Sequence, residues 1–134
     1  MGYYTNYELS ASYCKIDNNG TRTKVVPIPE LVLGCLEKEI DKMNVFEDGS
    51  ISDTLWANAK WYDWEGDMLL LSKRFPDVLF YLHGDGENST DLWDAYFLGG
   101  KVQHCPAEIK YDDFDPLKLS SVDGSDKINS YSYE

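Results

Sequence analysis

The 134-residue chain carries 24 Asp and Glu against 12 Lys and Arg, a formal net charge of −12, together with ten Tyr, five Phe and four Trp. Because an acidic surface repels nucleic acids and anionic membranes, this charge disfavours direct nucleic-acid binding and favours a basic protein as partner. The 43% of hydrophobic residues excludes a wholly disordered acidic chain, which would have few aromatic and apolar residues.

Location and domain organisation follow from the termini and the cysteines. The N-terminal residues lack the basic and apolar regions of a secretory signal, and no apolar run reaches the roughly 18 residues of a membrane span, so we expect a cytoplasmic protein without membrane contact. We expect residues 1–110 to form one domain and residues 111–134 to form an acidic tail that is partly docked or flexible. Cys14, Cys35 and Cys105 are too far apart for a C-x-x-C motif, so buried free thiols are expected.

The first half of the chain predicts a strand, a helix and a hairpin. Residues 3–16 alternate apolar and polar side chains, as a half-buried strand does. Residues 29–44 place apolar side chains at helical spacing, and Gly34 within this helix predicts close packing against a neighbour. Residues 45–47 and 51–60 predict the two strands of a hairpin, because the Asp-Gly pair between them is a strong turn signal.

The second half predicts a helix followed by three strands. Residues 63–75 place apolar side chains on one helical face, with acidic residues in the first turn and basic ones in the last. Residues 78–83 form a nearly continuous apolar run, which is typical of a central strand covered on both faces. Strands at 91–98 and 101–109 complete an antiparallel meander, with the two glycines between them as the turn.

This order of elements predicts an α+β fold, in which a mostly antiparallel sheet carries two helices packed on one face. The first six elements follow the order of a ferredoxin-like split β-α-β unit, to which a C-terminal hairpin is added. The tryptophans fall at strand or helix spacing and are expected in the core, as residues Trp56, Trp61, Trp64 and Trp93.

Residues 60–100 also carry a distinctive motif. It consists of Lys-Trp-Tyr-Asp-Trp-Glu-x-Asp-Met, Leu-Ser-Lys-Arg-Phe-Pro-Asp-Val-Leu-Phe, His-Gly-Asp-Gly-Glu and Asp-Leu-Trp-x-x-Tyr-Phe. This motif resembles a family of small, mostly uncharacterised bacteriophage and prophage proteins, and its part from residue 72 onward is similar to the ferredoxin-like C-terminal domain of YubB-type proteins. The resemblance transfers no catalytic residues. It implies a phage-like origin, location in the host cytoplasm and interference with a host system.

The sequence predicts neither an enzyme nor a metal or cofactor site. His83 with Asp85 and Glu87 could form an acid-base or metal cluster, but the favoured interpretation is a polar turn. His104 and Cys105 are adjacent on a strand, so they are expected to point to opposite faces and not to form a catalytic pair. No glycine motif for phosphate and no calcium loop is present in the sequence.

The leading hypothesis is a non-enzymatic acidic protein that inhibits a host nucleic-acid-handling or defence complex. In an anti-CRISPR-like DNA mimic of this kind, carboxylates occupy the basic channel of the partner in place of phosphates. The predicted partner-binding residues are Asp85, Glu87, Asp91, Asp94, Asp112, Asp113 and Asp115.

Two alternatives from other classes stay open. One is a binder or sponge for a small nucleotide-like signal, held in an aromatic pocket or at an oligomer interface. Such a site needs cationic groups, and Arg22 and Lys24 form the only local basic excess outside a helix end. The other is a structural module that assembles into a homo-oligomer when an exposed strand edge pairs two chains.

Overall fold

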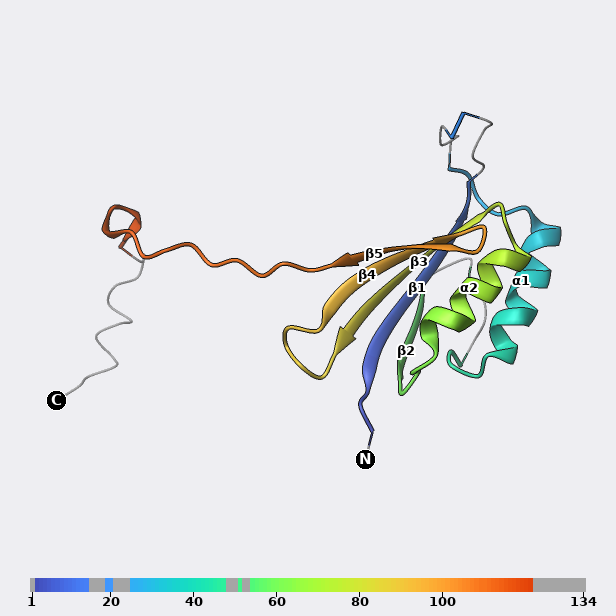
Figure 1. Ribbon diagram of the computed structural model, residues 1–134, viewed down its shortest axis with the longest axis horizontal. Coiled ribbons are helices and arrows are strands. Elements are labelled where there is room, and N and C mark those ends of the chain that lie inside the picture. The colour runs from blue at the N-terminus through green and yellow to red at the C-terminus, as the bar shows by residue number, and fades with distance from the viewer. Residues whose placement is uncertain (1, 15–18, 21–24, 48–50, 52–53, 122–134) are drawn as a thin grey trace.

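The computed structural model describes residues 2–14, 19–20, 25–47, 51 and 54–121, and it confirms the α+β class (Figure 1). The strands are β1 (Thr5–Tyr13), β2 (Leu55–Ala59), β3 (Val78–Gly86), β4 (Leu92–Leu98) and β5 (Lys101–Pro106), and the helices are α1 (Glu30–Lys42), α2 (Trp64–Arg74) and the short 3-10 helix η1 (Pro116–Lys118). The five strands form one antiparallel sheet in the order β2-β1-β3-β4-β5.

The strand order contains the split β-α-β unit. It differs from the ferredoxin-like pattern in one strand, the one expected at residues 45–47. β1 lies between β2 and β3 and pairs antiparallel with both, so α2 connects two parallel strands across it. The prediction of a strand at residues 45–47 is wrong, because these residues form bends, and the Asp-Gly turn after them lies outside the described residues. β2 is therefore the edge strand of the sheet.

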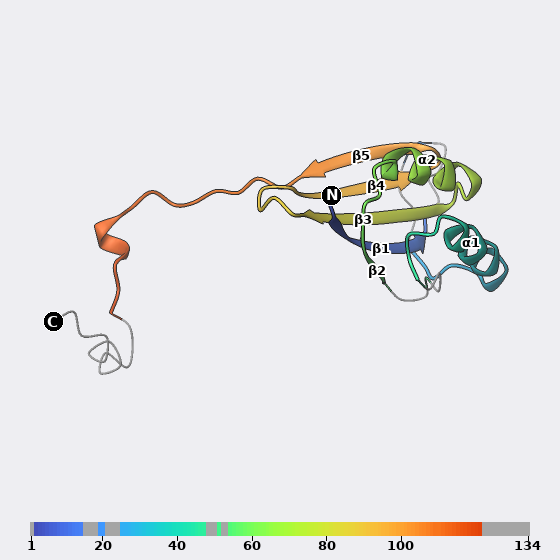
Figure 2. The ribbon, with the colours of Figure 1, turned by 90° about the horizontal axis from the view of Figure 1, so that it is seen from below.

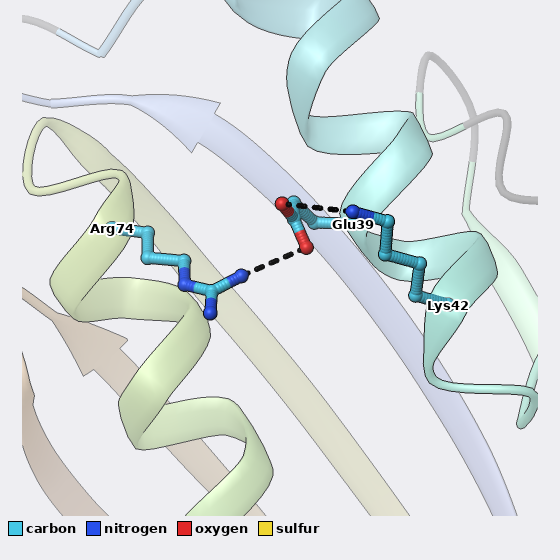
Figure 3. Close-up of polar contacts among 3 residues, drawn as sticks. All are labelled: Glu39, Lys42 and Arg74. Carbon is cyan, nitrogen blue, oxygen red and sulfur yellow. Dashed lines mark hydrogen bonds and ion pairs between the residues drawn. The ribbon is translucent and has the colours of Figure 1, made fainter.

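Both helices pack on the same face of the sheet (Figure 1). Leu36 of α1 and Met68 of α2 are fully buried in one core cluster with Phe80 of β3. Between the two helices, Arg74 Nη1 of α2 lies 2.9 Å from Glu39 Oε2 of α1, and within α1 Lys42 Nζ lies 3.6 Å from Glu39 Oε1 (Figure 3). In the described part of the chain, neither helix has the length and apolarity needed to cross a bilayer.

Alternation along the strands separates the core from the opposite face of the sheet. Tyr7 and Leu9 of β1 are buried beneath the helices, whereas Glu8 between them is half-buried on the other side. Along β3, buried and half-buried residues alternate in the same way. The prediction that this strand is covered on both faces is therefore wrong, because the helices in the described part of the chain cover one face and leave the other open.

The tryptophans and the cysteines each include buried and exposed side chains. Trp61 is buried as predicted, but Trp56 is 68% exposed, because its neighbours Leu55 and Ala57 are the β2 residues that pack on the core. Of the three thiols, Cys14 is buried, Cys35 on α1 is exposed and Cys105 is intermediate. The expectation of buried thiols therefore holds for Cys14 and is wrong for Cys35.

After β5 the chain leaves the sheet. The segment 107–121, here called the C-terminal arm, runs away from the strands in both views (Figures 1 and 2). The strand expected up to residue 109 ends at Pro106, and one further hydrogen bond, from the Ala107 N–H to the Leu92 carbonyl at 3.0 Å, precedes the departure of the chain. Within the arm, Asp115 Oδ1 accepts a hydrogen bond from the Leu117 N–H at 3.0 Å and caps η1. The apolar residues of the arm are exposed, namely Ile109, Tyr111, Phe114, Leu117 and Leu119.

Gly34 does not pack closely, contrary to the expectation from the sequence. A Cβ at this position would meet no atom within 4 Å, and the residue is exposed within α1. By contrast, a Cβ at Gly84 would overlap the indole ring of Trp93 on the neighbouring strand. Glycine is thus required at position 84 and dispensable at position 34.

We expect Gly34→Ala to raise the free energy of unfolding by about 0.5–1 kcal/mol, since alanine loses less backbone entropy than glycine in a helix. Gly84→Ala serves as the contrasting variant and should destabilise by about 1–3 kcal/mol through overpacking against Trp93. Urea unfolding of both variants checks the pair. A destabilised Gly34→Ala variant would contradict the open surroundings of that residue.

Candidate functional site

The face of the sheet opposite the helices, here called the open face, carries one continuous row of side chains. The strand registers place one residue from each strand opposite its neighbour across the whole sheet. From β2 to β5 this row is Trp56, Glu8, His83, Asp94 and Cys105. None of the five is fully buried, so the row is accessible along its length.

A hydrogen-bonded cluster lies at the centre of this row. Asp94 Oδ1 accepts a hydrogen bond from the Tyr81 hydroxyl at 3.0 Å and lies 2.7 Å from His83 Nδ1. With the carboxylate ionised, His83 donates through Nδ1, so its Nε2 stays available to another group. The Tyr81 ring also packs against Tyr96, with ring centroids 5.3 Å apart. These contacts fix the direction of the imidazole.

A groove of about 760 Å³ lies beside the cluster, at the β2 side of the open face. Its wall contains the carboxylates of Glu8, Glu47 and Asp85, and of the described residues that line it none is Lys or Arg. The wall also contains Trp56, His83 and the two asparagines Asn6 and Asn58, and Asn58 Nδ2 donates to Asn6 Oδ1 at 2.6 Å. Its other residues are Tyr7, Val45 and Ala57. Such a wall presents acceptors and an aromatic face, which suits a cation.

Two of the predicted partner-binding residues lie at this site. Asp85 lines the groove, and Asp94 holds the His83 imidazole in the neighbouring row. Two others lie at the end of the β3–β4 hairpin and bind the N-terminal segment. Glu87 Oε2 accepts a hydrogen bond from the Tyr4 N–H at 3.1 Å, and Asp91 Oδ2 accepts one from the Tyr3 hydroxyl at 2.9 Å.

The remaining three predicted residues lie on the C-terminal arm. Asp112 Oδ2 is 3.5 Å from Lys118 Nζ, Asp115 caps η1, and Asp113 is exposed. The seven acids therefore form three separate groups: the open face, the hairpin end and the arm. Arg22 and Lys24, the residues of the small-ligand alternative, lie outside the described residues.

The other polar candidates do not gather into a metal site in the described part of the chain. No group of three His, Cys, Asp or Glu there is placed to hold a metal ion. His104 Nε2 lies 3.1 Å from Glu65 Oε2 on the helix side, whereas Cys105 faces Asp94 on the open face. The predicted separation of His104 from Cys105 is confirmed.

Sequence reasoning missed Glu8, Glu47 and Trp56 as members of the site. Glu8 and Trp56 had a visible signal, since each alternates with residues of a core face. Their meeting depends on the β1–β2 register, which joins two segments far apart in the chain. Glu47 could not be placed by alternation, because residues 45–47 form bends and not the expected strand.

Comparisons of the chain with protein-family models, with curated proteins and with solved structures found no match. The chemistry of the site is therefore interpreted from its own residues.

The Tyr81 hydroxyl gives the open face a measurable pH dependence. Burial, with the hydrogen bond to Asp94, raises the pKa of Tyr81 from 10.0 to about 12. The folded protein thus keeps this proton at a pH where the unfolded chain loses it, so the stabilisation is complete below pH 10 and declines as the pH rises to about 12. We expect Tyr81→Phe to flatten the fall in unfolding free energy over this range, as measured by urea unfolding.

Some slope should persist in Tyr81→Phe, because burial also raises the pKa of Tyr7. Ultraviolet titration of the phenolates should show one group fewer with a raised pKa. An unchanged slope together with an unchanged titration would contradict the role assigned to the Tyr81 hydroxyl.

Proposed function

We propose that the protein is a non-enzymatic binding protein whose open face receives a basic segment of a protein partner. The observation that carries this proposal is the groove, which Glu8, Glu47 and Asp85 line together with the exposed Trp56. No described lining residue is Lys or Arg. A Lys or Arg side chain of the partner would pair with these carboxylates and stack on the indole.

Two properties of the groove favour such binding over a diffuse attraction. Glu8 and its neighbours are held on paired strands, so little conformational entropy is lost when a cation is bound. A hydrogen bond to a charged group contributes about 1.5–3 kcal/mol, more than an exposed surface ion pair does. The net charge of −12 adds long-range steering of a basic partner, which speeds association at low salt.

The proposal extends to the nature of the partner. A basic surface that fits this groove is typical of proteins that bind nucleic acid, and carboxylates bound there would compete with phosphates. The phage-like origin implied by the motif in residues 60–100 supports a host nucleic-acid-handling or defence complex, such as a CRISPR effector, as the target. In that case the protein acts as an inhibitor that mimics nucleic acid.

A titration with a hexa-arginine peptide tests the groove by calorimetry at low salt. Glu8→Gln combined with Asp85→Asn should weaken binding by about tenfold or more, equivalent to about 1.4 kcal/mol. The matched control is Asp112→Asn with Asp113→Asn, which changes the net charge equally but on the C-terminal arm, and it should leave most of the affinity intact.

Equal losses in the two double variants would show that overall charge, and not the groove, attracts the peptide. Unchanged affinity in the groove variant would also overturn the proposal. Trp56→Leu separates the aromatic contribution, and we expect it to weaken the peptide without altering the net charge.

A further inference from the structure

A second pocket, of about 300 Å³, lies on the helix side of the sheet at the end where β1 begins. Six aromatic rings line it, and we call it the aromatic pocket: Tyr3, Tyr7, Trp61, Tyr62, Trp64 and Trp93. Tyr7 and Trp61 are buried, whereas Tyr3 and Tyr62 are exposed at 38% and 66%. The pocket is therefore closed by buried rings on one side and bordered by accessible rings on the other.

The rings of the pocket are held in place by contacts among themselves. Trp64 and Trp93 stack with ring centroids 4.3 Å apart and planes inclined by 19°. Tyr7 and Trp61 form an edge-to-face pair with ring centroids 5.2 Å apart. The Tyr7 hydroxyl donates to the Trp61 carbonyl at 3.1 Å, and the Tyr3 N–H donates to the Tyr62 hydroxyl at 2.9 Å. A ligand would thus meet a preorganised aromatic wall.

Among the described residues that line the aromatic pocket, Asp91 is the only one with a charged side chain. Its Oδ2 accepts the Tyr3 hydroxyl at 2.9 Å, and its Oδ1 accepts no hydrogen bond within the described ranges. Lys60 is not among the lining residues, and its Nζ lies over the Tyr4 ring, 5.0 Å from the centroid. With a carboxylate and no cation in the wall, the pocket is unsuited to the phosphate of a nucleotide and suited to a positive charge.

We propose that the aromatic pocket binds a methylated ammonium group, such as that of choline or of a trimethyllysine side chain. Aromatic faces attract a cation through their quadrupole, and methyl groups pack on rings while reducing hydration. An unmethylated ammonium has three donors to satisfy, whereas the wall offers few unoccupied acceptors besides Asp91. The open-face groove lies on the other side of the sheet, and Tyr7 is the one described residue that lines both sites.

Titrations of the full chain followed by the indole N–H signals in NMR test the proposal. Choline should bind saturably, and its neutral isostere 3,3-dimethyl-1-butanol should bind at least about tenfold more weakly, since it has the shape without the charge. A peptide whose single trimethyllysine is its only charged group distinguishes the source of the cation. Tighter binding of the peptide than of choline would indicate a protein side chain, and equal binding would indicate the free cation.

Asp91→Asn should weaken choline by several-fold while Asn Oδ1 still accepts the Tyr3 hydroxyl, and Asp113→Asn on the C-terminal arm is the matched control with unchanged affinity. Tyr62→Leu removes an exposed ring and should also weaken binding without disturbing the fold. The proposal is overturned if the neutral isostere binds as well as choline, if Asp91→Asn and Tyr62→Leu both bind like the parent, or if no saturable binding occurs.

Discussion

The two-residue period of β1 and β3, covered by helices on one side only, is the constraint on which the rest of the structure depends. It buries Leu9 and Leu82 beneath α1 and α2 and places Glu8 and His83 on the open face. A register slip by one residue would exchange the two sets, exposing leucines whose burial contributes about 1.5–3 kcal/mol each. Stability and the geometry of the site are thus set by the same pairing.

The difference from a ferredoxin-like sheet also shapes the site. Because residues 45–47 form bends and not an edge strand, Val45 and Glu47 line the groove beside β2. Trp56 can remain exposed because β2 is the last strand of the sheet on this side. An absent edge strand therefore accounts for a groove in which an indole and carboxylates lie together.

The sequence was sufficient for the α+β class and for both helices, since their periods are visible in each segment. It was not sufficient for residues 45–47, which form bends in place of the expected strand. It also predicted that His104 and Cys105 lie on opposite sides of their strand. It did not reveal which acids lie together, because that depends on pairing between distant segments, as Glu8 with His83 shows. Cys35 was expected to be buried but is exposed, because the apolar residues at helical spacing did not show on which side of α1 this cysteine lies.

The two pockets lie on opposite faces of the sheet, and both present carboxylate and aromatic groups to a cation. NMR mapping of a bound hexa-arginine peptide at low salt tests whether the open face receives a basic segment. We expect the largest chemical-shift changes at Glu8, Asp85 and the Trp56 indole, with α1 and α2 unaffected. Changes confined to the helices or to the C-terminal arm would contradict this expectation.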